Sequence, residues 1–569
     1  MKRRFTDREN KTRRVYHPGP GLSRTSGYKP AIGIGFQVIS VSGRIVAMKN
    51  FFLTAILFTT VLAGSAIAQT PTPTPVATPA ISTVRSGAQT LQDLQSRIAS
   101  RLASAELRRG QVGVKIVSLT SGKVIFEQNS EKYFMPASNM KNFTVATAIE
   151  KLTPDFRFVT SVFAPAAPDP TGTVKGSVRI FGRGDVSIST RFSEGNYYKG
   201  LDDLADKIVA AGVKRIEGDL IADETFFSGN PIPGEWEFDD LQWDYGAEIS
   251  ALPINDNAID ISVKPGPSGY SCVVKMTPFN PVIRIMNQCV TSGAGTLRTL
   301  KIEKKVDRNI IEITGSLPSG NAGFTGSVTV SRPADLFVAL LKERLAAKGV
   351  VVTGQTRAVN EKPIGQPEPS VEIAKLESPP LSLVAQKTMK PSQNMYTETL
   401  LWTLGENARA AMAAPGGGTV TSTATSADLG LSAVKRFLVE IGVAPDGIIQ
   451  HDGSGLSRHN LITPAAVVQL YTYMGKQSRF SQAWRESLTI GGVDGTLRNR
   501  FKGTRAAGND RGKTGTIEQV SALSGYVRTA AGEELVFSMV VNGVNETSMR
   551  TSAMDEVVVS LANFDGKVD

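Results

Sequence analysis

Three short polar motifs, widely separated along the chain, most constrain how it can fold. Ser138 and Lys141 stand three residues apart at the start of an apolar, helix-like run, so they share one helix face about one turn apart. A hydroxyl and an amine held in this way can act as a nucleophile and its base. Ser392 and Asn394 open a second apolar helix, and Lys513 opens a strand. If the motifs form one site, the fold must bring together groups 254 and 375 residues apart.

The secondary-structure pattern divides the chain into an interrupted outer part and a central insertion. Residues 85–156 read as helix, hairpin and helix, and residues 376–569 read as helices followed by three strands and a last helix. Residues 157–375 consist mainly of short strands separated by turns rich in Gly, Pro, Asn and Asp. We therefore predict a multi-domain α/β protein. One domain, formed by 85–156 and 376–569, is interrupted by a β-rich region, 157–375, that is large enough for two domains.

The positive charge of the chain lies mostly at its N-terminus. The sequence has 63 Lys and Arg against 52 Asp and Glu, which gives a net charge of +11. Residues 1–68 account for nine of these charges, so the rest of the protein is nearly neutral. A nucleic-acid-binding protein would carry its basic residues on the folded domain. We therefore predict no nucleic-acid partner.

The N-terminal segment has the pattern of an export signal. An apolar run at Phe51–Leu62 follows a basic stretch and precedes small residues that end at Ala68, which predicts a signal peptide cleaved after Ala68. The Pro/Thr-rich residues 69–84 then form a linker. The alternative is an uncleaved segment, which would give weak membrane association. Residues 1–47 are either a long extension or lie upstream of a true start at Met48.

The few cysteines and histidines exclude the common metal and thiol chemistries. Cys272 and Cys289 are the only cysteines, and in an exported protein a pair of cysteines predicts one disulfide, with two free buried thiols as the alternative. The three histidines, His17, His451 and His459, form no H-E-x-x-H motif and no Cys/His cluster. We therefore predict no metal site and no cofactor.

The motifs assign a role to each of their polar residues. Ser138 attacks a carbonyl carbon and Lys141 takes its proton, although a free lysine, with a pKa near ~10.4, would be protonated at neutral pH. Burial or a nearby cation, for which Lys513 is the candidate, has to lower that pKa. Ser392 relays a proton to the leaving nitrogen, and Asn394 hydrogen-bonds Lys141 and a substrate amide.

The Lys513 segment is predicted to bind the substrate. Lys513 and Thr514 hold a substrate carboxylate, and Gly515 leaves room for the substrate to lie along the strand. The backbone N–H groups of Ser138 and Thr516 form the oxyanion hole.

A Ser-His-Asp triad is the rival catalytic arrangement. His451, Asp452, Ser454 and His459 lie close together in the sequence. No G-x-S-x-G elbow surrounds these serines, so a structural turn is the better interpretation of this segment.

The order Ser-x-x-Lys, Ser-x-Asn, Lys-Thr-Gly is typical of serine penicillin-recognising enzymes. With Phe181–Asp185, Trp236–Asp240 and Asp452–Asn460, it resembles the penicillin-binding D-alanyl-D-alanine carboxypeptidases/endopeptidases of class C, peptidase family S13. The resemblance covers nearly all of the chain after the signal peptide. One departure is Val186, which stands where the family often has proline.

The resemblance implies a β-lactamase-like transpeptidase domain interrupted by β-rich domains. It also implies an exported, periplasmic enzyme that cleaves D-Ala-D-Ala ends or diaminopimelate crosslinks of peptidoglycan, with β-lactams as inhibitors. By similarity, Asp240 binds the amino group of the diaminopimelate side chain and Ile517 packs beside it, with Asp239 and Asp244 as alternative acids. The balance between carboxypeptidase and endopeptidase activity stays open. The other readings are a β-lactamase or esterase on the same fold, and a non-catalytic cell-wall-binding protein.

Overall fold

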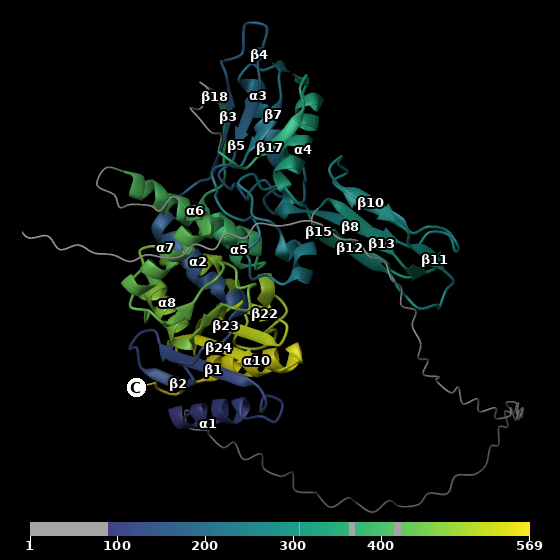
Figure 1. Ribbon diagram of the computed structural model, residues 1–569. Coiled ribbons are helices and arrows are strands. Elements are labelled where there is room, and N and C mark those ends of the chain that lie inside the picture. The colour runs from purple at the N-terminus through teal and green to yellow at the C-terminus, as the bar shows by residue number, and fades with distance from the viewer. Residues whose placement is uncertain (1–88, 306–307, 363–369, 415–422, 569) are drawn as a thin grey trace, which may run out of the picture. The chain divides into compact units, whose positions relative to one another are not determined.

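The computed structural model describes most of the chain after the predicted linker (Figure 1). The described residues are 89–305, 308–362, 370–414 and 423–568. The predicted N-terminal extension, signal peptide and linker lie outside these ranges. Among the helices within them, none is both long and apolar enough to cross a membrane.

The largest sheet has six strands and joins the two ends of the described chain. Its order is β2-β1-β24-β23-β22-β21, and every pair is antiparallel. The strands are β1 (Gln111–Ser118), β2 (Val124–Gln128), β21 (Thr489–Ile490), β22 (Arg511–Ile517), β23 (Val520–Arg528) and β24 (Glu534–Asn542). β1 pairs with β24, with Gln111 opposite Asn542. The hairpin β1–β2, which precedes Ser138 in the chain, is thereby held in one sheet with β22, the strand that carries Lys513.

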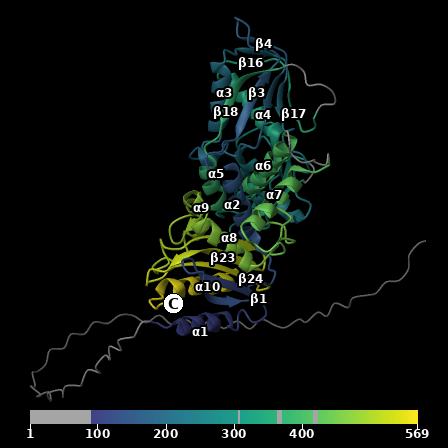
Figure 2. The same cartoon turned by 90° about the vertical axis from the view of Figure 1, so that its left-hand side faces the viewer.

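Helices cover both faces of this sheet (Figures 1 and 2), and its alternate side chains pack into two different cores. Ala522 and Tyr526 of β23 belong to the first core, whereas Leu523 and Val527 belong to the second. The first core is built with α2 (Lys141–Leu152), α5 (Leu381–Met389), α6 (Asn394–Ala413), α7 (Ser426–Glu440), α8 (Pro464–Lys476) and α9 (Ser481–Ser487). The second is built with α1 (Leu91–Leu102) and α10 (Thr547–Asn563). Because both faces are covered, the central strands β23 and β24 are buried over almost their whole length.

The first part of the insertion is a smaller α/β unit with parallel strands. Its five-stranded sheet has the order β17-β7-β5-β3-β18, and a three-stranded sheet has the order β16-β6-β4. The strands are β3 (Val159–Ala164), β4 (Thr173–Lys175), β5 (Val178–Phe181), β6 (Arg215–Glu217), β7 (Leu220–Asp223), β16 (Val351–Val352), β17 (Thr356–Val359) and β18 (Val371–Glu377). The β5–β7 and β7–β17 pairs are parallel, as are β4–β6 and β6–β16. Helices α3 (Lys199–Ala210) and α4 (Pro333–Ala347) share their core.

The second part of the insertion consists of short strands. They are β8 (Ala258–Lys264), β9 (Val273–Thr277), β10 (Arg284–Asn287), β11 (Val290–Ser292), β12 (Lys301–Lys304), β13 (Ile310–Thr314), β14 (Ser316–Pro318) and β15 (Phe324–Thr329). They form sheets of order β15-β8-β9, β10-β13-β12 and β11-β14. A disulfide joins Cys272 to Cys289, with their Cα atoms 5.3 Å apart. The remaining strands, β19 (Ile448–Ile449) and β20 (Leu461–Ile462), pair with each other.

Candidate active site

Ser138 lies in a short 3₁₀ turn rather than in the helix itself. The turn η1 (Ala137–Met140) leads directly into α2, so the start of the predicted helix is a 3₁₀ turn followed by an α-helix. Ala137 adopts a left-handed conformation with φ of 46°. Such a conformation is costly for a residue with a Cβ and is often found beside functional groups. The Ser138 side chain is partly exposed, whereas Lys141 is fully buried.

Three oxygen atoms surround the Lys141 amine. Its Nζ lies 2.9 Å from Ser138 Oγ, 2.5 Å from Asn394 Oδ1 and 2.8 Å from the backbone oxygen of Ser454. Burial lowers the pKa of Lys141 to about 7, while the nearby carboxyl groups of Asp452 and Glu398 act in the opposite direction. A large fraction of Lys141 is therefore neutral near pH 7.

The chemistry of these neighbours orients the neutral amine. A neutral lysine has two N–H donors and one lone pair. The oxygen atoms of Asn394 and Ser454 are carbonyl oxygens, which can only accept hydrogen bonds. They take the two N–H groups, and the Ser138 hydroxyl is the neighbour that can donate to the lone pair. The arrangement therefore directs a base at the Ser138 proton.

Lys513 lies against the second serine of the set. Its Nζ donates to Ser392 Oγ at 2.8 Å and to the Thr514 carbonyl oxygen at 2.7 Å. Burial, and next the charge of Lys141, lower the pKa of Lys513 well below its usual value. Burial is the main cause that lowers the pKa of both amines, and repulsion between Lys141 and Lys513 adds to it at Lys513. A bound carboxylate would restore the charge of Lys513.

Two glycines from distant segments press against the turn that carries Ser138. A methyl group at Gly515 would lie 2.5 Å from the Pro136 carbonyl oxygen and 3.1 Å from the Ser138 nitrogen. At Gly455, with φ of +83°, it would lie 1.9 Å from the Ala137 carbonyl oxygen. Glycine at 515 was expected to leave room for substrate. In the structure it is also required for strand β22 to approach η1.

A cleft of about 440 Å³ brings together six of the predicted site residues. They are Ser138, Asp240, Ser392, Asn394, Thr516 and Ile517. Lys141, Lys513, Thr514 and Gly515 are buried and do not line it. The cysteine pair is not part of the cleft either. The insertion contributes one wall through η3 (Phe238–Gln242) and η4 (Asp244–Gly246).

One end of the cleft carries charges of both signs. Asp239 and Asp240 line it, whereas Asp244 does not. The pKa of Asp240 is raised above its usual value, mainly by burial and also by the charge of Asp239. A hydrogen bond from Tyr245 and the charge of Arg458 act in the opposite direction. Arg458 also pairs with Glu237 at 2.9 Å.

Arg458 and Tyr245 also line the cleft, and neither was predicted as a site residue. The backbone oxygen of Tyr245 accepts a hydrogen bond from Asn394 Nδ2 at 2.8 Å. Arg458 lies within Asp452–Asn460 and Tyr245 follows Trp236–Asp240, two segments that carry the family resemblance, but a sequence does not show which side chains face the motifs.

The histidine segment does not form a triad. Asp452 accepts hydrogen bonds from Gly455 N, Ser457 N, Asn460 Nδ2 and Trp236 Nε1, at distances of 2.7 to 3.0 Å. Among the described residues, no hydrogen bond joins the side chain of His451 or His459 to Asp452 or Ser454. The segment is therefore a structural turn built around the buried carboxylate of Asp452, which is the interpretation that the sequence favours.

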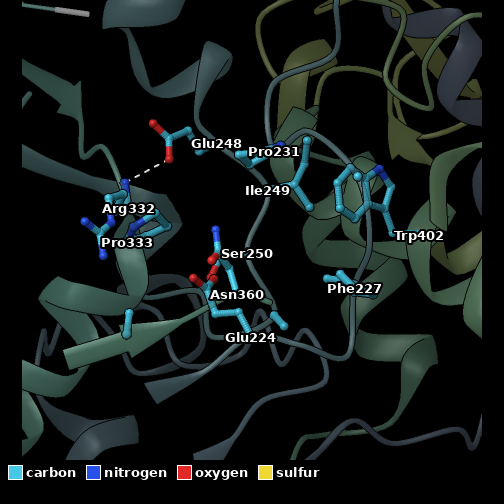
Figure 3. A pocket seen from close by; sticks show the side chains of 13 residues that line it. Glu224, Phe227, Pro231, Glu248, Ile249, Ser250, Arg332, Pro333, Asn360 and Trp402 are labelled. Carbon is cyan, nitrogen blue, oxygen red and sulfur yellow. Dashed lines mark hydrogen bonds between the residues drawn. The ribbon is translucent and has the colours of Figure 1, made fainter. Parts of the chain in front are cut away.

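A smaller cavity of about 110 Å³ lies apart from the cleft and shares no lining residue with it. Figure 3 shows Phe227 and Trp402 at one side of this cavity and Arg332, whose backbone N–H bonds to Glu248, at the other. Burial raises the pKa of Glu224, another lining residue, to about 7. None of the three motifs reaches this cavity.

Comparison with known proteins gives consistent matches over most of the chain. A sequence model of the D-Ala-D-Ala carboxypeptidase 3 (S13) family matches residues 94–564. A D-alanyl-D-alanine carboxypeptidase of Actinomadura sp. (strain R39) is 35% identical over 492 residues, which are 84% of this chain and 86% of that protein.

Solved structures share the fold. The crystal structure of penicillin binding protein 4 from Haemophilus influenzae has a TM-score of 0.69 and 22% identity, covering 82% of this chain and 99% of that one. A structure of the same protein complexed with a β-lactam has a TM-score of 0.64 and 23% identity, covering 82% and 98%. The predicted α/β fold class and the predicted resemblance are confirmed.

Proposed function

The chain belongs to the D-Ala-D-Ala carboxypeptidase 3 (S13) family, and from this premise we propose that it cleaves peptidoglycan stem peptides through an acyl-enzyme on Ser138. It is a serine-type D-Ala-D-Ala carboxypeptidase, a hydrolase. One observation supports the assignment of the nucleophile above all others. The Lys141 amine lies 2.9 Å from Ser138 Oγ and has carbonyl acceptors for both of its N–H groups.

Acylation begins at the carbonyl carbon of the penultimate D-alanine. Lys141 Nζ accepts the hydroxyl proton while Ser138 Oγ bonds to this carbon. The backbone N–H groups of Ser138 and Thr516 stabilise the oxyanion. The C–N bond to the last D-alanine then breaks, and the proton that Lys141 took passes through Ser392 to the leaving nitrogen, which leaves Lys141 neutral. The hydrogen bond from Lys513 holds the Ser392 side chain in place for this step.

Deacylation uses the same base. Water attacks the ester carbon, Lys141 takes a proton from the water, and Ser138 Oγ leaves and is reprotonated. The enzyme returns to its starting state with a shortened stem peptide as product.

The carboxylate of the last residue binds beside β22. Lys513 and Thr514 are the proposed ligands, and Asn394 binds the substrate amide as well as Lys141. The Thr514 hydroxyl donates to Thr496 Oγ1 at 2.7 Å. When the substrate binds, the Thr514 hydroxyl turns its one hydrogen from Thr496 to a carboxylate oxygen, which can only accept.

The charged end of the cleft accommodates the diaminopimelate side chain. This side chain ends in an amino group and a carboxylate. Asp240 is the proposed ligand of the amino group, Ile517 packs against the methylene chain, and Arg458 supplies the opposite charge. Both a D-Ala-D-Ala end and a crosslink would then use one cleft.

Penicillin acylates Ser138 in the same way. Its lactam carbonyl and carboxylate have the chemistry of the D-Ala-D-Ala end, and the Haemophilus influenzae relative is known in complex with a β-lactam. The apolar run before Ala68 supports export, so the proposed place of action is the periplasm, where the stem peptides lie.

Labelling with a fluorescent penicillin tests the proposal. The mature protein is incubated with the label, digested, and the labelled peptide identified by mass spectrometry. We expect label on Ser138 in the wild type and in a matched Ser560→Ala variant on α10, and none in Ser138→Ala. A folded wild type without label on Ser138 would refute the enzyme mechanism and favour a non-catalytic wall-binding protein.

Substrate assays separate the remaining activities. Release of D-alanine from a pentapeptide measures carboxypeptidase activity, and cleavage of a crosslinked dimer measures endopeptidase activity. Asp240→Asn should weaken cleavage of diaminopimelate substrates more than acylation by penicillin. Rapid release of hydrolysed penicillin would instead assign the protein as a β-lactamase.

A further inference from the structure

We propose that Glu398, a buried acid on α6, is a positioning residue that orients Lys141 toward Ser138 through the turn at Gly453 and Ser454. The proposal rests on the proposed role of Lys141 as the base. Glu398 touches neither Ser138 nor the cleft, and its hydrogen bonds go to the backbone N–H groups of this turn and to the Ser454 side chain.

Glu398 holds the turn with both carboxyl oxygens. Oε1 accepts from the Ser454 N–H at 2.7 Å and Oε2 from the Gly453 N–H at 2.9 Å. The side chain is 1% exposed, so water does not compete for these bonds. These two bonds fix the Gly453–Ser454 peptide unit, and the Ser454 carbonyl belongs to the next unit, whose Gly455 N–H donates to Asp452 Oδ1 at 2.7 Å.

The carbonyl group of the same turn contacts the base. The Ser454 oxygen accepts from Lys141 Nζ at 2.8 Å, and the Gly453 oxygen accepts from the Thr144 hydroxyl at 2.9 Å. If the turn rotated, the Ser454 oxygen would leave Lys141. The amine could then direct an N–H group, instead of its lone pair, at Ser138.

One helix therefore sets both N–H acceptors of Lys141. Asn394 and Glu398 are four residues apart on α6 and lie on the same face. Asn394 provides one acceptor directly, and Glu398 fixes the other through the turn. Gly455, wedged against the Ala137 carbonyl, prevents the turn from shifting toward η1.

A role of Glu398 through its charge and a role through its position predict opposite effects on the acylation rate. The titratable groups that face Lys141 are Asp452 and Glu398, whose charged forms raise its pKa, and the neighbouring Lys513, while burial raises the pKa of Glu398 itself to about 8. A role through charge alone predicts that removing the Glu398 carboxylate lowers the pKa of Lys141. More of the amine would then be neutral, and acylation would be equally fast or faster near pH 7. A positioning role predicts slower acylation at every pH.

The test is the rate of penicillin acylation in three variants. Glu398→Gln removes one acceptor oxygen, and Glu398→Asp keeps the charge but withdraws it from the turn. Glu406→Gln is the matched control, because Glu406 is a buried acid on the same helix that bonds to Ser426 and Arg409 instead. The limiting acylation rate and the half-saturating penicillin concentration are measured at pH 7 and pH 9, with thermal unfolding as the check on folding.

For both Glu398 variants we expect the limiting rate to fall by about 10- to 100-fold at both pH values. The half-saturating concentration should stay within about threefold, and Glu406→Gln within about twofold of wild type. If the Glu398→Gln variant does not fold, the acylation rate of the Glu398→Asp variant tests the proposal instead.

Three results would overturn the inference: an unchanged or faster rate in Glu398→Gln, a loss confined to the half-saturating concentration, or full activity in Glu398→Asp. A wild type that is not labelled on Ser138 would instead refute the proposed function itself.

Discussion

At the scale of single residues, the titration of Lys141 should set the pH dependence of acylation. Burial lowers its pKa to about 7, and the base is active only when neutral. The acylation rate should therefore rise with pH through about 7 and level off above about 8. Lys141→Met should slow acylation by about 100-fold or more.

Stopped-flow acylation between pH 5.5 and 9 measures this profile. Lys151→Met is the control, because Lys151 lies on the same helix but is exposed and paired with Glu440. A rate that does not change with pH over this range would contradict the assignment of Lys141 as the base.

Asp510 is a second buried group whose titration should be measurable, this time in stability. In the described structure both of its carboxyl oxygens are buried without a hydrogen-bond partner. Burial raises its pKa from 3.8 to about 8, with Arg500 lowering it and Asp555 raising it. The folded state then holds a proton that the unfolded state releases, so this residue lowers stability progressively as pH rises from about 4 to about 8.

Asp510→Asn removes that pH-dependent loss. We expect the unfolding midpoint of the variant to exceed that of wild type by about 4 °C or more at pH 8, and the two to agree near pH 4. Calorimetry at the two pH values measures this difference. Equal midpoints at pH 8 would mean that Asp510 is not held protonated.

At the scale of elements, the contact between β22 and η1 should be the most sensitive packing in the site. A methyl group at Gly515 would push against the backbone of Pro136 and Ser138. Gly515→Ala should therefore displace the nucleophile and slow acylation by about tenfold or more. Gly234→Ala is a suitable control, since its added methyl group meets no atom within 4 Å.

The same penicillin-labelling rate measures both glycine variants. A wild-type rate in Gly515→Ala, with the fold intact, would show that the turn can move without cost to catalysis.

The sequence predicts the elements of the outer domain closely because their signals are local. Apolar periodicity and terminal turns predict helix 426–441, and the structure has α7 at Ser426–Glu440. Alternation predicts strand 535–542, and the structure has β24 at Glu534–Asn542. The insertion is less predictable. The pattern of residues 173–180 predicts one strand, whereas the structure has two, β4 and β5, separated by a bend. Each of the two pairs in parallel with a different neighbour.

The residues of the candidate site also differ in whether a local sequence signal predicts them. The motifs predict Ser138, Lys141 and Asn394 because residues of these types at this spacing are typical of a catalytic site. The structure brings these residues into contact. Glu398 and Tyr245 carry no such pattern. Glu398 accepts from a backbone N–H group 56 residues away, and the backbone oxygen of Tyr245 accepts from the Asn394 side chain 149 residues away, so only the folded chain reveals these partners.

At the scale of the whole molecule, the insertion and the outer domain are joined at the active site by several hydrogen bonds. Trp236 donates to Asp452, the Tyr245 carbonyl accepts from Asn394, and the Tyr396 hydroxyl bonds to Asp256. The insertion is therefore part of the catalytic apparatus in this proposal, and not an independent appendage.

The disulfide belongs to the other part of the insertion and should stabilise without affecting catalysis. It closes a loop of 17 residues, which corresponds to about 3 kcal/mol in the chain-entropy model. The double variant Cys272→Ala/Cys289→Ala should unfold at a lower temperature and keep the wild-type acylation rate. Thermal unfolding and penicillin labelling measure the two properties. A slower acylation rate in the folded variant would show that the short-strand region also shapes the cleft.

The two glycines against η1 also restrict how this protein can evolve drug resistance. With Gly455 on one side and Gly515 on the other, the backbone around Ser138 has no space for an added methyl group. On the proposed mechanism, penicillin and the stem peptide both need Ser138 in the same place, so a displaced nucleophile would slow both reactions. Substitutions that affect the two differently are therefore expected at the charged end of the cleft, at residues such as Arg458 and Glu518.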